Sequence, residues 1–168
     1  MVTVLTKAVV SSDARIATTV RVVVHTYGPK VNDRSWNHWS IYLILADGSG
    51  SVRVNMRAEY EGYDNGILEW SDCPYTESNS NISHWDFPCR ASTRIRDIAA
   101  VIYVVIKDLS ELKELAKDKD LAKNVAQDLV ENGTIATNAA TVVWSKLLYL
   151  YHRSKTPESL EMVQGKFY

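Results

Sequence analysis

The sequence changes character near residue 91, and this change constrains the fold more than any other feature. Residues 1–91 contain five of the seven glycines, three of the four prolines and four of the five tryptophans. Their short apolar runs, rich in Val, Ile, Thr and aromatic residues and separated by turn residues, are typical of β-strands. We expect strands at residues 3–10, 16–26, 38–46, 51–57, 66–70 and 82–87.

Two dipeptides in this half predict tight turns. Asp47-Gly48 lies between two of the expected strands, and Asn65-Gly66 precedes another. Glycine adopts the positive φ angles of hairpin turns without steric cost. The Asp47-Gly48 turn therefore predicts a hairpin that joins residues 38–46 to residues 51–57.

The second half shows apolar residues at helical spacing. Its first segment follows Ser92 or Thr93, either of which can cap a helix. This segment is rich in β-branched residues, so a strand is the alternative to a helix here. The other expected helices cover 110–131 with an interruption near Asp118, 138–153 with Tyr151 on the buried stripe, and 156–165. Strands followed by helices predict an α+β fold, in which an antiparallel sheet packs against helices. At 168 residues, we expect a single domain, strand-rich over residues 1–91 and helix-rich over residues 92–168.

Charge and hydropathy exclude several partners. The net charge is −1, with 19 basic and 20 acidic residues interspersed along the chain, so we expect no nucleic-acid partner. The longest apolar run, residues 98–106, has nine residues, whereas a membrane span needs about 20. The N-terminus lacks the pattern of a secretory signal. We therefore expect a soluble cytoplasmic protein without a membrane span, and the sequence specifies no oligomeric state.

The most informative pattern lies at residues 37–42, Asn-His-Trp-Ser-Ile-Tyr. On a strand, His38, Ser40 and Tyr42 share one face. The hairpin returns the next strand antiparallel and places Asn55 near His38. An Asn that holds a histidine ring across a sheet fixes the imidazole tautomer for acid–base chemistry. The candidate catalytic residues are therefore His38, Asn55 and Tyr42.

Four tryptophans in the strand-rich half are candidates for substrate binding. Indoles bury large areas in protein cores, but four of them in half of a small domain can equally line an apolar cavity for a flat ligand. The sequence leaves both interpretations open. The candidates are Trp36, Trp39, Trp70 and Trp85.

We expect no cofactor and no metal. The four histidines show no HxH or HxxxH spacing, and the chain has no CxxC motif, Gly-rich phosphate loop or GxSxG motif. His84 and Asp86 share one strand face, but such a pair is more often a surface contact. Cys73 and Cys89 are too few for a disulfide framework, so we expect reduced thiols.

Two resemblances rest on the residues around His38. The run His-Trp-Ser-Ile-Tyr, the Gly-containing turn and the polar residue on the next strand resemble the histidine strand of the lecithin:retinol acyltransferase-like group, which is circularly permuted papain-like. That group keeps its nucleophilic cysteine at the start of a late helix, where this sequence has Ala139. Residues 36–106 are also similar to a family of small uncharacterised fungal proteins of unknown function.

Three functions follow from these residues and resemblances. The first is a cofactor-independent acid–base catalyst, an isomerase or cyclase, acting on an apolar small molecule of fungal secondary metabolism. His38 would transfer the proton, Asn55 would orient it and Tyr42 would donate a hydrogen bond. The second is a non-catalytic ligand- or protein-binding module on a papain-like scaffold without the nucleophile. The third is a cysteine-dependent hydrolase or acyltransferase that uses Cys89 or Cys73.

Overall fold

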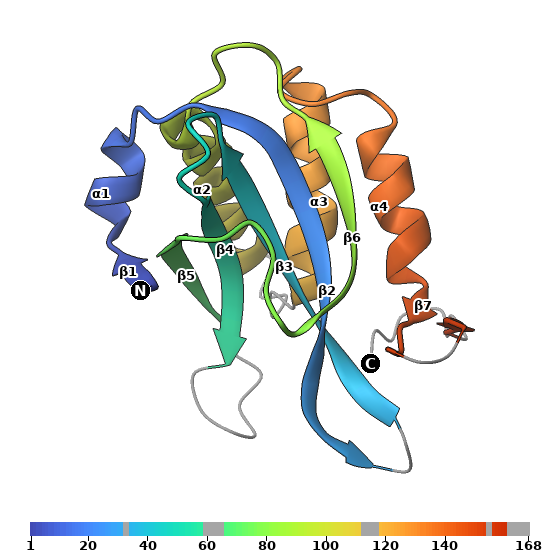
Figure 1. The fold of residues 1–168 in the computed structure, drawn as a ribbon. Coiled ribbons are helices and arrows are strands. Elements are labelled where there is room, and N and C mark those ends of the chain that lie inside the picture. The colour runs from blue at the N-terminus through green and yellow to red at the C-terminus, as the bar shows by residue number, and fades with distance from the viewer. Residues whose placement is uncertain (32–33, 59–65, 112–117, 154–155, 161–168) are drawn as a thin grey trace.

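A computed structural model describes residues 1–31, 34–58, 66–111, 118–153 and 156–160. The fold is α+β, as the sequence predicts: the N-terminal half forms a six-stranded antiparallel sheet (Figure 1). The sheet order is β1-β5-β4-β3-β2-β6. Its strands are β1 (Thr3–Leu5), β2 (Ala17–Val31), β3 (Arg34–Leu45), β4 (Ser51–Ala58), β5 (Gly66–Cys73) and β6 (Asn81–Pro88).

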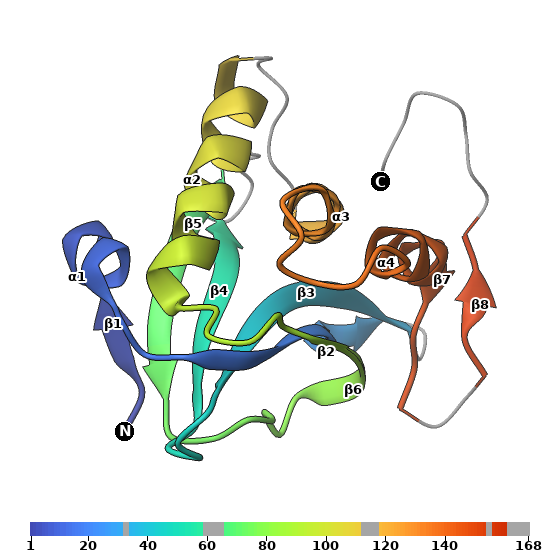
Figure 2. The ribbon, with the colours of Figure 1, turned by 90° about the horizontal axis from the view of Figure 1, so that it is seen from above.

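The helices cover one face of this sheet. The described helices are α1 (Lys7–Ser12), α2 (Ile95–Glu111), α3 (Asp118–Glu131) and α4 (Ala139–Leu147). Of these, α2, α3 and α4 lie on the same side of the strands (Figure 2). A short ribbon, β7 (Tyr149–Leu150) paired with β8 (Glu158–Ser159), follows α4.

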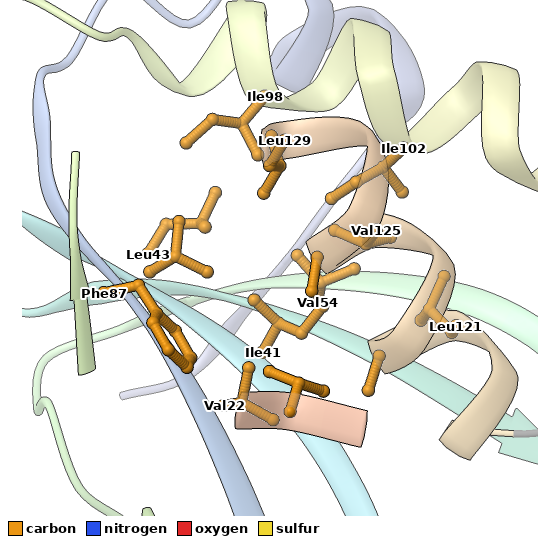
Figure 3. Packing of buried hydrophobic residues seen from close by; sticks show 14 of the residues in the cluster. Val22, Ile41, Leu43, Val54, Phe87, Ile98, Ile102, Leu121, Val125 and Leu129 are labelled. Atoms are coloured by element: carbon orange, nitrogen blue, oxygen red, sulfur yellow. The ribbon is translucent and has the colours of Figure 1, made fainter. Parts of the chain in front are cut away.

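The hydrophobic core lies between the sheet and the helices. Alternate residues of each central strand point into it, because successive side chains of a strand point to opposite faces. Figure 3 shows this packing between Ile41 and Val54 of the sheet and Ile102, Val125 and Leu129 of the helices. Burying a side chain of this size contributes about 1.5–3 kcal/mol. The helices therefore cover this face of the sheet with packed apolar side chains.

The Asp47-Gly48 turn is confirmed. Gly48 has a φ of +73°, and the backbone N–H of Ser49 donates to Asp47 Oδ1 at 3.0 Å. The Asn65-Gly66 turn lies partly outside the described residues.

The expected strand at residues 3–10 is only partly correct, because β1 ends at Leu5 and α1 begins at Lys7. Thr6 caps α1: its Oγ1 accepts a hydrogen bond from the backbone N–H of Val9 at 3.4 Å. A capping hydroxyl three residues before a free N–H favours a helix start. The helix also buries Val10 fully in the core.

Two expectations near the C-terminus are also wrong. The helix that starts at Ala139 ends at Leu147 and does not reach Tyr151. Asn37 of β3 explains this, because its side chain accepts from Tyr151 N at 2.6 Å and donates to Tyr151 O at 2.9 Å. Tyr151 is buried, as expected, but from an extended segment. Glu158–Ser159 is a strand rather than the start of a helix, and the expected end at Gly165 lies outside the described residues.

Candidate functional site

The face of the sheet that points away from the helices carries polar side chains in rows. Antiparallel strands place the side chains of paired residues next to each other on one face. The rows pair His25 with His38, Ser40 with Asn55, and Tyr42 with both Arg53 and Arg21. We call this surface the polar face. It contains all three candidate catalytic residues.

His38 is a partly exposed histidine of the polar face. Its Nε2 is hydrogen-bonded to Oδ1 of Asn55 on the neighbouring strand, as the hairpin register predicts. Because an amide oxygen only accepts hydrogen bonds, Nε2 carries the ring proton and Nδ1 carries the lone pair. Asn55 therefore sets both the orientation and the tautomer of this imidazole.

His25 is the residue of the site that sequence reasoning missed. Its Nδ1 lies 2.9 Å from Ser80 Oγ and its Nε2 lies 2.6 Å from Ser40 Oγ. The ring centroids of His25 and His38 are 6.1 Å apart. A signal was present in the sequence, since His25 directly follows the run Val22-Val23-Val24 and shares a strand face with Val23.

The connection between β5 and β6, residues 74–80, crosses the polar face in front of the central strands (Figure 1). Besides the contact between His25 and Ser80, hydrogen bonds to its backbone carbonyls hold it there. Ser51 Oγ donates to Tyr75 O at 2.6 Å, Arg21 Nη1 donates to Thr76 O at 3.0 Å, and Thr26 N donates to Ser80 O at 3.1 Å. His25 and Tyr42 are buried, with 6% and 0% of their surface exposed. His38 and Asn55 lie on the more accessible part of the face.

The electrostatic surroundings of His25 keep it neutral. Burial, together with the charges of His38 and Arg53, lowers the pKa of His25 to about 4. At neutral pH, one of its nitrogens therefore donates to a serine oxygen and the other accepts from a serine hydroxyl. Ser78 extends this network, because its Oγ lies 2.9 Å from Ser80 Oγ.

His25 is expected to make the protein less stable as the pH falls. An unfolded histidine binds its proton near pH 6.5, whereas folded His25 binds it only near pH 4. The unfolded state therefore holds more protons between these values, and the free energy of unfolding falls by about 2 kcal/mol from pH 7 to pH 5. Urea unfolding of the wild type and of His25→Asn measures this. Equal pH dependence in both proteins would show that His25 titrates normally.

Tyr42 and Arg53 lie side by side in the next part of the polar face. Burial raises the pKa of Tyr42, against an opposing effect from the nearby Arg53 charge, so the phenol stays protonated. The Tyr42 ring lies 6.1 Å from the His25 ring and 6.5 Å from the Tyr75 ring. Arg53 Nη2 lies 3.4 Å from Glu69 Oε1.

Three of the four candidate tryptophans lie on the opposite side of the sheet, so the structure does not bring them together with His38. Trp39 and Trp70 are buried in the core. Trp85 is half-buried, and its ring stacks on Trp39 with centroids 5.8 Å apart. Trp36 belongs to β3, but its side chain lies outside the described residues. The described residues therefore do not form an apolar cavity that joins these indoles to His38.

Neither cysteine lies in surroundings that activate a thiol. Cys73 is buried with 1% of its surface exposed, and burial raises its pKa. Burial also raises the pKa of Cys89 to about 11. Because the thiolate is the nucleophile, these surroundings do not favour the cysteine-dependent alternative. The position of the nucleophile in the resembling group is taken by Ala139, which is fully buried.

Both thiols are expected to react slowly with iodoacetamide near pH 7, with Cys73 the slower because it is buried more deeply. Mass spectrometry of timed samples, with and without urea, measures the two rates. Rapid labelling of either thiol in the folded protein near pH 6 would contradict this and restore a thiol-based mechanism.

Two further observations concern metals and membranes. Within the described part of the chain, no group of three or more His, Cys, Asp or Glu side chains lies close enough to hold a metal ion. The same residues include no helix with the length and hydropathy that crossing a bilayer requires.

His84 and Asp86 do share a face, and Asp86 binds Arg21 through both oxygens at 2.7 and 2.8 Å.

Comparison with known proteins places the chain in a family. No curated protein and no solved structure matches the sequence. The family model described as a domain of unknown function, DUF7770, matches residues 20–168. The matched span includes His25, His38, Tyr42, Arg53 and Asn55. Since it covers most of the chain, the protein belongs to the DUF7770 family.

Proposed function

We propose that the protein is a cofactor-independent acid–base catalyst, an isomerase or cyclase, that acts on an apolar small molecule. The hydrogen bond between His38 Nε2 and Asn55 Oδ1 carries this proposal. It directs the lone pair of the imidazole to Nδ1, on a side chain that solvent reaches. Imidazole changes protonation near neutral pH, and such a base typically accelerates a proton transfer by about 10²- to 10⁴-fold.

His38 would take a proton from a carbon acid of the substrate and return it to another atom. This step forms an N–H bond on Nδ1 and leaves an electron pair on the substrate, and the return reverses both changes. The adjacent His25 supports this cycle because its low pKa keeps it uncharged. A neutral neighbour does not repel the imidazolium that forms on His38.

Tyr42 has a different role in this proposal. Because its side chain is fully buried beneath residues 74–80, we assign it a positioning role under His25 rather than direct donation to the substrate.

The similarity to small fungal proteins favours secondary metabolism as the source of the substrate, and we place the reaction in the cytoplasm.

Native mass spectrometry of the protein purified from its own host, followed by incubation in heavy water, tests the proposal. We expect a co-purifying small molecule that the protein converts, or whose carbon-bound hydrogen it exchanges for deuterium. The exchange reports proton transfer even where the overall reaction is balanced. A bound molecule that is neither converted nor exchanged by the protein would contradict catalysis.

A non-catalytic binding module is the second candidate, and Trp85 is the observation that favours it. Its half-buried ring contacts Tyr151 at 5.4 Å between centroids, and Lys146 Nζ lies 5.8 Å from the Trp85 centroid. An exposed aromatic edge beside a cation is a common feature of binding surfaces. In that case Trp85→Ala weakens binding, whereas His38→Ala leaves it unchanged.

A further inference from the structure

Arg53 lies two residues before Asn55 on β4 and faces the same way. We propose that Arg53 binds a carboxylate of the substrate, so that the substrate is a monocarboxylic acid with an apolar body. The inference rests on the proposed function for placing the substrate beside His38. It adds a binding residue and a chemical class to that site.

The hydrogen bonds of Arg53 differ from those of Arg21 and Arg15. Arg21 binds both oxygens of Asp86 at 2.7 and 2.8 Å. Arg15 binds Asp13 and Asp72 at 2.7 to 3.1 Å. Both therefore have the short, paired bonds that a guanidinium makes with carboxylates.

Among the described residues, the hydrogen bonds of Arg53 to Glu69 and Ser71 are long by comparison. Its Nη2 lies 3.4 Å from Glu69 Oε1 and 3.5 Å from Ser71 Oγ. Its buried Nε finds no hydrogen-bond acceptor among the described residues. The Arg53 side chain is 24% exposed, so solvent reaches part of it. Arg53 is thus a partly desolvated cation with unused donor capacity.

Tyr42 borders this guanidinium. It lies opposite Arg53 on β3, its side chain is fully buried, and it interacts with the Arg53 guanidinium. Buried donors without acceptors cost free energy. The unpaired Nε–H of Arg53 is therefore suited to a group that brings acceptor oxygens. A carboxylate does so in the planar geometry that matches guanidinium.

The local charge favours a monoanion over a phosphate. Glu69, which lies opposite Asn55 on β5, already offsets part of the Arg53 charge, and Arg21 is neutralised by Asp86. One bound negative charge is therefore balanced here, whereas a dianion is not.

The register sets the length of the acid. Arg53 lies opposite Tyr42, and His38 precedes Tyr42 by four residues on β3, so Arg53 and His38 are about 13 Å apart along the strands. An acid held by Arg53 must therefore extend past Asn55, which binds His38, to reach the proton acceptor. The charges of both residues act on the same His25 ring, which places that ring close to each of them.

Nuclear magnetic resonance of the ¹⁵N-labelled arginine Nε groups tests this inference. The probes are benzoate, phenylacetate and hexanoate, each compared with its neutral primary amide. We expect the acids to shift the Arg53 signal with dissociation constants of about 1–10 mM, and the amides to leave it in place. The Arg21 signal is the internal control and stays unchanged. The Arg53→Lys variant assigns the Arg53 signal, because that signal is lost. We expect this variant to bind the acids about tenfold more weakly, as measured by ligand-observed spectra.

Two further variants separate this inference from the proposed function. Glu69→Gln removes the competing carboxylate and is expected to tighten binding of the acids. His38→Gln is expected to bind them as the wild type does, because the base is not needed for binding.

If none of the acids shifts the Arg53 signal, or if Arg53→Lys binds them as the wild type does, the inference is overturned, whatever His38 does in turnover. Acid binding at Arg53 without proton exchange would support the carboxylate site and reject the catalyst.

Discussion

Replacing His38 with Gln is expected to lower kcat by about 100- to 10,000-fold while the protein stays folded. The amide of glutamine keeps a polar group beside Asn55, so the sheet loses little. It has no basic nitrogen, so the proton acceptor is gone. Because His38 is only partly buried, we expect the free energy of unfolding to change by about 1 kcal/mol or less. Turnover of the co-purifying substrate and urea unfolding measure the two effects.

His84→Gln is the matched control for this variant. His84 also lies partly exposed on the polar face, where its Nδ1 lies 3.2 Å from Asn81 Nδ2. It makes no contact with Asn55 that would orient it for proton transfer. We expect His84→Gln to keep wild-type turnover. Full activity in His38→Gln would remove His38 from the mechanism.

Gly50→Ala is expected to destabilise the fold by about 3–5 kcal/mol, a large share of the 5–15 kcal/mol typical of a domain. Gly50 has a φ of +134°, and a Cβ at this position would lie 2.0 Å from Cys73 O and 3.0 Å from Pro74 Cα. Both neighbours are backbone atoms, so they cannot move aside as a flexible side chain would. They also start the connection that covers His25 and Tyr42, so the variant is expected to disturb the polar face first. Urea unfolding measures the loss.

Gly48→Ala provides the comparison two residues earlier in the same turn. Gly48 also has a positive φ, +73°, but a Cβ there would meet nothing within 4 Å. Its cost is therefore the backbone strain alone, about 1 kcal/mol. If the two variants unfold at the same urea concentration, the close approach of Gly50 to Cys73 is not what makes glycine necessary.

The local part of the site could be predicted from sequence. His38 and Asn55 lie on two strands joined by one tight turn, so turn chemistry and alternation are enough to bring them together. The same reasoning identified the strand content of the sheet. It was wrong at residues 3–10, where a capping Thr6 and a buried Val10 favour a helix that alternation does not reveal.

The remaining portion of the site depends on contacts between residues far apart in the chain. Burial is the largest cause of the low pKa of His25, and Ser80, whose hydroxyl contacts the His25 ring, lies 55 residues away in sequence. The positions of the tryptophans depend on which face of the sheet the helices cover, and no strand pattern specifies that. Trp39 and His38 are neighbours in sequence but point to opposite faces.

The most direct test of the proposed base is the tautomer of His38, measured by long-range ¹H–¹⁵N nuclear magnetic resonance above about pH 8, where imidazoles are neutral. We predict a proton on Nε2 and an unprotonated Nδ1 in the wild type, with a mixture of tautomers in Asn55→Ala. A proton on Nδ1 in the wild type would mean that Asn55 does not hold the ring as described. The lone pair would then face Asn55, and His38 could not act as the proposed base.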